Sequence, residues 1–567
     1  LHKEYRRQRQ MCIRDRSNIY HKVVLGVGAV IAMLTVASCS EFLETPSKSK
    51  LSTENFYDKP ANIDQNLVGI YGALKPFSKY YFVMSEFRSD NLFNTTEAKT
   101  NDQSDCAQFN STGLLTNSIV ASCWADHYTL IAAANVLLDR MDGAGLDGAV
   151  ATQYAAEARF LRALSYFDLV RFFGRVPISL HEIGPSEAFN IPQSEAIEVY
   201  EQAILPDLQY AVEHLQETAT DYLGKEHKER VSRKAAKALL GKVYMQLAGY
   251  PFYQDTKAEA QALFTDVLAT YTVNWAPTMK EWEEMWLHEN DNKYYLFEIQ
   301  YVAEKGQGNP ATPYSKGGNT YADEYCGANL TAGSHIYVER DLQEHFLESN
   351  TIDNGDGTTT EEYIDKRLWG TVNTGLTYDE ETGEYIGGAT DQNNFCVKMF
   401  ENKVKRGRLK YADMDADIVD RTCWPQNWPV LRIEDIMLLQ AELLGSSASN
   451  IDSNGNNGYF YLNLIRERAG LNALNTLPEE AYQQAVANER RYELIGEGHR
   501  WFDQVRQNTF VNDLQTMFIN YRDKRDASHS STYTIYANRL SQNSALYPIP
   551  QSQIRIREGL YTQNPGY

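Results

Sequence analysis

The sequence lacks the short motifs that bind metal ions or carry out nucleophilic catalysis. Its seven cysteines form no CxxC pair, and no Cys/His cluster has the spacing of a zinc site. There is no G-x-S-x-G elbow, no H-E-x-x-H helix and no Walker loop. We therefore expect no metal ion, no cofactor and no enzyme activity of these kinds.

Basic charge is also scarce. The 54 Lys and Arg residues stand against 75 Asp and Glu residues, which gives a formal charge of −21. Nucleic-acid binding needs a basic footprint for the phosphates, so we exclude this class of partner. Tyrosine is abundant instead, at 37 residues. Its flat apolar ring and hydroxyl suit contact with polar ligands, although tyrosines between packed helices are equally common.

Long apolar runs are absent except near the start of the chain. Residues 23–37 form a run of about fifteen residues, which is short for a membrane span and typical of a secretory signal. The run ends in the sequence VASC, which resembles a bacterial lipobox. We predict a signal peptide over residues 18–38 and a lipidated mature terminus at Cys39. The alternative is a secreted protein with an incidental cysteine.

Residues 1–17 form a stretch that we expect to be foreign to the natural protein. The segment MCIRDR at residues 11–16 resembles the translation of a sequencing-library adapter. Its basic residues follow no structural pattern, so we leave it out of the fold prediction.

Apolar spacing predicts a mainly α-helical protein. Residues 160, 163, 164, 167 and 170 recur at helical spacing, and Gly174 and Pro177 end that helix. The predicted helices cover residues 62–74, 119–141, 152–173, 194–215 (broken near Pro206), 232–248, 433–444, 459–468 and 479–505. Short loops between them, the L-G-x2-Y element at residues 240–244 and the A-x3-F element at residues 260–264 predict a tetratricopeptide-type superhelix.

A loop-rich stretch separates two groups of predicted helices. Residues 306–337 combine glycine with tyrosine, and residues 377–385 predict a β-hairpin across a Glu-Thr-Gly turn. Long loops of this kind are usually functional. We predict a helical body over residues 50–275 and 430–567, with a ligand-binding insertion carrying short β-hairpins over residues 300–425.

An ordered set of segments from Cys39 to Tyr567 resembles the SusD/RagB family of Bacteroidetes outer-membrane lipoproteins. The segments are CSEFLETP (39–46), LSTENF (51–56), SDN (89–91), AEARFLRA (156–163), YFDLVRFFGRVP (166–177), AAKALLGKVY (235–244), ERRYELIGEGHRWFD (489–503), LYPIP (546–550) and QNPGY (563–567).

The resemblance implies a single tetratricopeptide-containing domain over residues 39–567, anchored by lipid at the outer membrane and facing the exterior. It also implies a partner, a SusC-like TonB-dependent β-barrel, which receives a glycan from the lipoprotein. Some members of the family bind peptides instead. The ligand site is expected in loops opposite the helical repeats.

Two groups of polar residues invite other functions. Carboxylates crowd the helices that hold Glu157, Asp168, Glu489 and Glu493, and a glycosidase needs two carboxylates across a cleft. We expect ion pairs between packed helices instead. Residues 353–357 and 452–458 resemble calcium-binding loops in composition. They do not match the EF-hand pattern, so we predict turns. The sequence does not exclude a structural calcium ion.

The predicted ligand contacts lie in loops, where aromatic rings can face sugar rings and amides can form hydrogen bonds. By contrast, Trp282 and Trp286 lie in a helix-like stretch and are predicted to be core. The candidate contacts are Asp90, Asn91, Tyr314, Tyr321, Tyr325 and Trp369.

Several questions stay open at this point. A peptide ligand, a glycosidase and a tetratricopeptide scaffold for proteins are the alternatives to glycan binding. The sequence does not name the glycan or the oligomeric state. It also leaves open the pairing of Cys106, Cys123, Cys326, Cys396 and Cys423.

Overall fold

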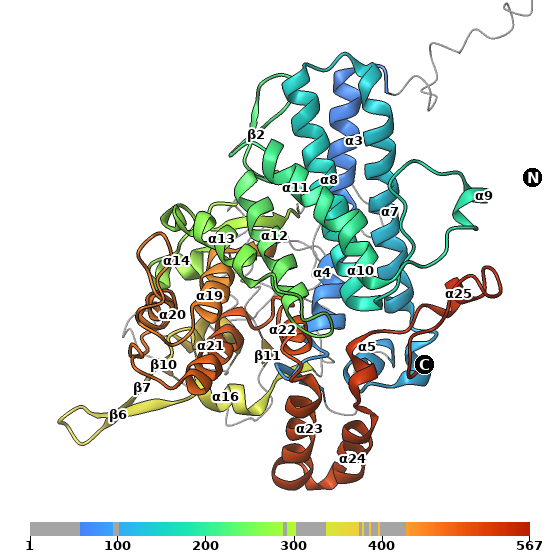
Figure 1. Cartoon of the computed structure of the whole chain (residues 1–567). Helices are drawn as coiled ribbons and strands as arrows, with labels where there is room; N and C mark the ends of the chain where they lie inside the picture. The colour runs from blue at the N-terminus through green and yellow to red at the C-terminus, as the bar shows by residue number, and fades with distance from the viewer. Residues whose placement is uncertain are drawn as a thin grey trace, which may run out of the picture. The chain divides into compact units, whose positions relative to one another are not determined.

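Helices make up most of the described chain, which confirms the predicted fold class (Figure 1). The computed structural model describes residues 57–94, 101–286, 292–301, 336–373, 377–378, 385–386, 395–396 and 427–567. The predicted leader, signal peptide and Cys39 lie outside these residues. The predicted limits of the insertion stay a prediction, because residues 302–335 and 397–426 also lie outside them.

The helices before the insertion include the five that the apolar spacing predicts, which begin at Pro60, Ser118, Gly148, Ala196 and Arg233, together with several others. They are α3 (Pro60–Gly72), α4 (Phe77–Tyr80), α5 (Asn101–Ala107), α6 (Ser111–Leu114), α7 (Ser118–Arg140), α8 (Gly148–Phe173), α9 (Pro185–Ala188), α10 (Ala196–Val199), α11 (Leu205–His214), α12 (Arg233–Ala248), α13 (Lys257–Leu268) and α14 (Met279–Glu284). The π-helical turns Tyr81–Glu86 and Tyr200–Ile204 continue α4 and α10, and the second precedes the predicted break near Pro206.

The later helices include the predicted helices over residues 433–444 and 459–468, together with several that the apolar spacing does not predict. They are α16 (Arg340–Phe346), α17 (Leu368–Thr371), α19 (Ile433–Leu444), α20 (Gly458–Arg468), α21 (Glu479–Leu494), α22 (Arg500–Arg506), α23 (Phe510–Asn520), α24 (Ser530–Arg539) and α25 (Gln551–Ile554). The prediction of one helix over residues 479–505 is wrong. Gly496 and Gly498 adopt φ values of 84° and 85°, which break the helix between α21 and α22.

Successive helices pack as neighbours, as tetratricopeptide-type pairing requires. Helix α7 packs on α8, α8 on α11, α12 on α13, and α19 on α13, α20 and α21 (Figure 1). Gly241 of the predicted L-G-x2-Y element lies at the contact between α12 and α13, and a Cβ there would lie 2.4 Å from the Phe264 ring. Glycine on α12 thus lets the Phe264 ring of α13 approach closely.

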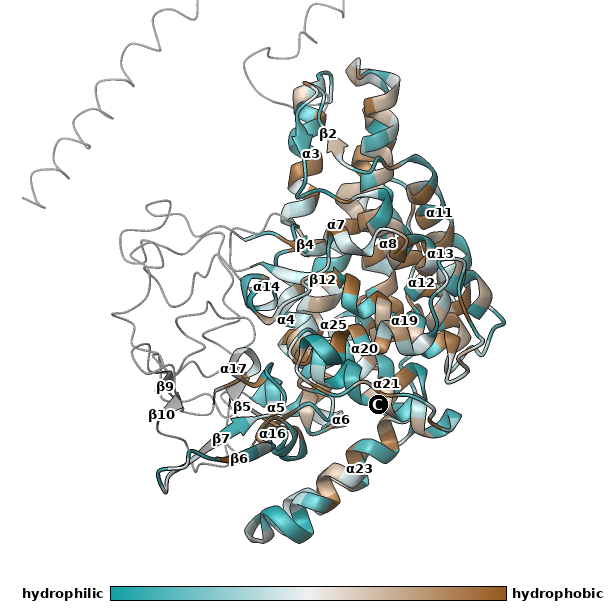
Figure 2. Ribbon diagram, turned by 90° about the vertical axis from the view of Figure 1, so that its left-hand side faces the viewer, coloured by the Kyte–Doolittle hydropathy of each residue, from teal (hydrophilic) through white to brown (hydrophobic). Residues whose placement is uncertain are grey.

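Helix α8 is the centre of this packing. It is covered on most sides, and 18 of its residues, including Glu157 and Asp168, are buried. It is largely brown in Figure 2, whereas the exposed hairpin of β6 (Ser349–Asp353) and β7 (Thr359–Tyr363) is mostly teal. No helix in the described part of the chain combines the length and apolarity needed to cross a membrane.

The strands are short and form two-stranded sheets. Strand β4 (Tyr295–Ile299) pairs with β12 (Trp428–Arg432), and both are buried along their length, so they join the two ends of the insertion inside the body. The remaining strands are β1 (Leu92–Asn94), β2 (Ala219–Thr220), β3 (Glu226–His227), β5 (Ile336–Val338), β6 (Ser349–Asp353), β7 (Thr359–Tyr363), β8 (Val372–Asn373), β9 (Thr377–Tyr378), β10 (Tyr385–Ile386) and β11 (Phe395–Cys396).

Three local predictions are confirmed by these elements. Strands β9 and β10 pair antiparallel, as the hairpin at residues 377–385 requires. The stretch 353–357 is the turn of the β6–β7 hairpin, where the Asp353 carboxylate accepts the Gly355 amide at 2.9 Å. In the stretch 452–458, Asp452 accepts the amides of residues 454 and 456. Trp282 and Trp286 are buried in the core.

Candidate ligand-binding face

A group of short strands and one helical turn connects the predicted ligand contacts. Strand β1 pairs with β5, β5 contacts β11, and β11 pairs with β8, which directly follows α17. Asp90 and Asn91 precede β1, and Trp369 lies in α17. We call β1, β5, β8, β11 and α17 the loop frame, because the loop-rich segments of the sequence begin and end at these elements.

Four of the predicted contacts lie wholly or partly beyond the described residues. Tyr314, Tyr321 and Tyr325 fall within residues 302–335, outside the described chain. The backbone of Trp369 is part of α17, but its side chain is not among those described. These residues stay predicted contacts.

Asp90 and Asn91 are buried and form bonds within the protein. They are 6% and 1% exposed. The Arg500 guanidinium donates to both Asp90 oxygens at 2.7 and 2.9 Å. Arg491 donates to the Asn91 side-chain oxygen at 3.0 Å, and the Asn91 amide group donates to Glu86 at 2.7 Å. This placement gives both residues a structural role at the start of β1, and contact with a ligand stays a prediction for them.

The end of β5 is bonded to the same group of residues. The Glu339 amide donates to the Asn91 carbonyl at 2.8 Å, which extends the β1–β5 ladder by one bond. The Glu339 carboxylate caps α16 through the amides of residues 341 and 342 and lies 3.5 Å from Arg491. On the other side, the Phe93 ring stacks on Tyr521 with centroids 4.0 Å apart. The β1–β5 pair is therefore fixed to α21 and to the end of α23.

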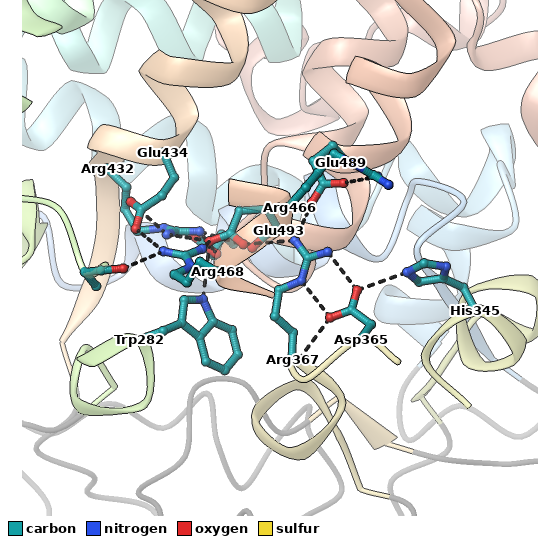
Figure 3. A network of polar contacts seen from close by, with 12 residues as sticks. Trp282, His345, Asp365, Arg367, Arg432, Glu434, Arg466, Arg468, Glu489 and Glu493 are labelled. Atoms are coloured by element: carbon teal, nitrogen blue, oxygen red, sulfur yellow. Dashed lines mark hydrogen bonds and ion pairs between the residues drawn. The ribbon is translucent and has the colours of Figure 1, made fainter. Parts of the chain in front are cut away.

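A buried cluster of arginines and carboxylates holds the other end of the loop frame (Figure 3). Arg367, directly before α17, is 0% exposed. Its guanidinium donates to both Asp365 oxygens at 3.0 and 2.7 Å and pairs with Glu489 and Glu493 at 2.8 and 3.1 Å. His345 of α16 lies 3.1 Å from the same Asp365 carboxylate. The turn before α17 is thereby bonded to α16 and α21.

The cluster continues into the helical body. Arg432 at the end of β12 pairs with Glu434, Glu493 and Glu497 at 3.0, 3.1 and 2.7 Å. Arg468 at the end of α20 pairs with Glu434 and Glu493 at 3.0 and 2.7 Å. Glu493 is therefore shared by three arginines, from the insertion, from β12 and from α20. We call Asp365, Arg367, Arg432, Glu434, Arg468, Glu489, Glu493 and Glu497 the ion cluster.

The carboxylates that suggested a glycosidase have structural partners. Glu489 and Glu493 bond to arginines of the ion cluster, Asp503 pairs with Arg490 at 2.7 Å, and Asp168 pairs with Arg171. The interpretation as ion pairs is confirmed for these residues. Within the described chain, Glu157 is not in an ion pair: its carboxylate accepts the Tyr71 hydroxyl at 2.7 Å and the Gln153 side-chain amide at 3.0 Å, so the prediction is wrong for it. Among the described residues, no group of three or more His, Cys, Asp or Glu side chains is arranged to hold a metal ion.

The pKa values of Asp365 and Glu339 are shifted in opposite directions. Burial alone would raise the pKa of Asp365, but the Arg367 charge and the His345 hydrogen bond outweigh it and lower the pKa to about 2. Burial raises the pKa of Glu339 to about 7, and the Arg491 charge offsets only part of this rise. Asp365 thus stabilises the fold at pH values above the pKa of an ordinary aspartate. This contribution is lost as the pH falls towards 2.

We expect a Glu339→Gln variant to change how stability depends on pH. Folded Glu339 holds its proton up to about pH 7, whereas the unfolded chain releases it near 4.5, so Glu339 lowers the unfolding free energy by about 3 kcal/mol across that window. Glutamine keeps an oxygen for the α16 cap and does not titrate. Denaturant unfolding at pH 4.5–7 should show a flatter profile for Glu339→Gln. The control Glu344→Gln, at an exposed pair with Arg525, should keep the wild-type slope; equal slopes in all three proteins would contradict the prediction.

An apolar groove of about 490 Å³ lies elsewhere, between α7, residues 177–191 and the segment after α25. Its lining includes Trp124, Tyr128, Ile131, Phe189 and Ile556. It contains none of the predicted ligand contacts. Sequence patterns did not identify it, because its three segments are far apart in the chain and meet only after folding.

The structure describes the side chains of two of the five cysteines whose pairing the sequence leaves open. Cys106 and Cys123 are free and buried. Burial raises the pKa of the Cys106 thiol to about 12. Both thiols are therefore protonated and inert at neutral pH.

The fold defines a helical-repeat protein with several short two-stranded sheets, and the comparisons assign it to a family. The SusD family model matches residues 293–567. A second model, described as "Starch-binding associating with outer membrane", matches residues 41–245. The chain belongs to the SusD family, as the ordered sequence segments predicted.

Individual relatives agree with this assignment over most of the chain. The SusD-like protein P38 of Formosa agariphila is 25% identical over 502 residues, which cover 85% of this chain and 90% of the relative. A SusD homologue from Bacteroides thetaiotaomicron has the same fold, with a TM-score of 0.71 at 23% identity over 91% of this chain and 98% of that one. A laminarin-binding SusD-like protein gives a TM-score of 0.64 at 24% identity, over 90% of this chain and 100% of that one.

Proposed function

We propose that this protein captures a glycan at the cell surface and delivers it to a SusC-like TonB-dependent transporter in the outer membrane. Membership of the SusD family is the observation that carries this proposal. It is supported by the laminarin-binding relative and by another structural neighbour that was solved with a xylogluco-oligosaccharide. A lipid on Cys39 would hold the protein at the membrane; fractionation of cells that carry Cys39→Ser tests this anchor.

The loop frame is the proposed place of binding. Its strands and α17 are fixed to the helical body by the Asp90–Arg500 pair, Arg491 and the ion cluster. A rigid base of this kind lowers the entropy lost when loops bind a ligand. Tyr314, Tyr321, Tyr325 and Trp369 are the proposed aromatic contacts, and Asp90 and Asn91, which directly precede β1, are the proposed polar contacts.

We expect Trp369→Ala and Tyr321→Ala each to weaken glycan binding about fivefold to tenfold, because one aromatic contact contributes on the order of 1 kcal/mol. The measurement is calorimetric titration of the protein with laminarin oligosaccharides, xylogluco-oligosaccharides and mixed peptides. The control is Tyr253→Ala, which removes an aromatic ring that is 64% exposed outside the loop frame.

The outcomes separate the ligand classes. Saturable binding of one glycan that falls in both loop variants and not in Tyr253→Ala supports glycan capture. Binding of peptides alone would keep the family role and overturn the ligand class. Binding of neither class would favour a scaffold for proteins.

A further inference from the structure

The α17 turn is held by the protein core on two sides. On one side, Arg367 connects the start of the turn to Glu489 and Glu493 of α21. On the other side, Gly370 lies against the indole of Trp282 from α14. A Cβ at Gly370 would be 2.3 Å and 2.8 Å from the ring atoms Cζ3 and Cη2 of Trp282. Trp369 lies between these two anchor points in the chain.

The two anchors share one carboxylate. The Trp282 indole N–H donates to Glu493 at 3.3 Å, and Arg367 donates to the other oxygen of Glu493 at 3.1 Å (Figure 3). The amides of Leu368 and Gly370 donate to the carbonyls of Asp365 and Arg367, which closes the turn. A shift of Trp282 or of Glu493 therefore moves the backbone on both sides of Trp369.

Stability alone does not explain this arrangement. Burying a guanidinium and several carboxylates has a desolvation cost that often equals or exceeds the attraction between them. Apolar side chains of similar size often give a fold that is equally stable or more stable. A buried guanidinium with several hydrogen bonds instead fixes the orientation of the residues around it. Its planar N–H donors fit only one arrangement of carboxylates. Glycine at position 370 also lets the backbone approach the Trp282 ring more closely than any residue with a Cβ would allow.

We propose that Arg367 and Gly370 are positioning residues that set the α17 turn, so that Trp369 is preorganised for its ligand. This inference rests on the proposed function, in which Trp369 contacts the glycan. Both residues act through the backbone of α17 and touch no ligand themselves. Preorganisation of this kind raises affinity by removing the ordering cost from the binding step.

The experiment is a double-mutant cycle with Gly370→Ala and Trp282→Phe. Alanine at 370 collides with the benzo ring of Trp282 and pushes the turn away; phenylalanine at 282 lacks that ring and makes room for the new methyl group. We expect Gly370→Ala to weaken the glycan complex about tenfold, and the double variant to recover most of that loss. The probes are laminarin oligosaccharides and xylogluco-oligosaccharides, each titrated calorimetrically.

The matched control is Gly241→Ala, since a Cβ there would meet the Phe264 ring at 2.4 Å, far from α17 in the sequence. Both glycine variants are overpacked and should lower Tm comparably, but only Gly370→Ala should change affinity. Hydrogen exchange of the peptide that covers residues 364–373 gives a second readout without any ligand. It should rise about tenfold in Gly370→Ala and return towards the wild-type rate in the double variant.

Each outcome decides one of the two proposals. If the wild-type protein binds a probe and Gly370→Ala binds it as well as Gly241→Ala does, the positioning role is overturned. If the wild-type protein binds neither probe, the proposed ligand class fails, and exchange decides the positioning role by itself. Unchanged exchange in Gly370→Ala would then overturn it, and exchange restored by Trp282→Phe would support it.

Discussion

Replacement of Arg432 by methionine is expected to lower the free energy of unfolding by about 3–5 kcal/mol. Arg432 is 0% exposed, and its guanidinium faces Glu434, Glu493 and Glu497, which are buried as well. The variant removes the positive charge at the centre of these three carboxylates and leaves them in a medium of low polarity. The measurement is denaturant unfolding at neutral pH, followed by far-ultraviolet circular dichroism.

A surface ion pair provides the control for this prediction. Arg140 pairs with Glu182 at 2.5 Å, but the two side chains are 32% and 34% exposed. Water solvates Glu182 when its partner is lost, so Arg140→Met should lower the unfolding free energy by less than about 1 kcal/mol. If the two variants lower the unfolding free energy equally, burial does not determine how much the ion cluster contributes to stability.

Replacement of Gly498 by alanine is expected to lower the free energy of unfolding by about 2–4 kcal/mol, through strain and collision together. Gly498 has a φ of 85°, and a Cβ there would lie 2.7 Å from both the Cβ atom and the carbonyl oxygen of Tyr81. The backbone of Gly498 cannot shift to relieve this collision, because its amide donates to Glu86 at 3.0 Å and its carbonyl accepts the Ser85 hydroxyl at 2.7 Å.

The control separates the collision from the backbone strain. Gly455 has a similar φ of 82°, and a Cβ there would meet no atom within 4 Å. Gly455→Ala should therefore show only the cost of the left-handed conformation, about 1–2 kcal/mol. Denaturant unfolding of both variants gives the comparison; equal losses would show that the close approach to Tyr81 contributes nothing.

Local patterns in the sequence were enough for most of the helical structure. The prediction of a helix over residues 433–444 matches α19, and the Gly-then-Pro signal ends α8 at Phe173. Helix spacing and helix ends depend on residues three or four positions apart, so the sequence contains the information directly. The same holds for the hairpin at β9 and β10, where turn residues set the pairing.

The break between α21 and α22 could not be predicted in this way. Gly496 and Gly498 donate their amides to Glu86, which lies about four hundred positions earlier in the chain. The charged residues around them have helical spacing, so the pattern predicts one continuous helix. The requirement for a left-handed backbone arises only when the π-helical turn Tyr81–Glu86 packs against this segment.

By itself, the sequence determined the helical class, most of the long helices, the family and the net acidic charge. These follow from local spacing, composition and the order of short segments. Only the tertiary structure decided that Asp90 and Asn91 are buried, that Glu493 is shared by three arginines, and that Gly370 faces Trp282. The physical reason is that burial and ion pairing depend on which distant segments pack together, and the sequence pattern around each residue does not contain that information.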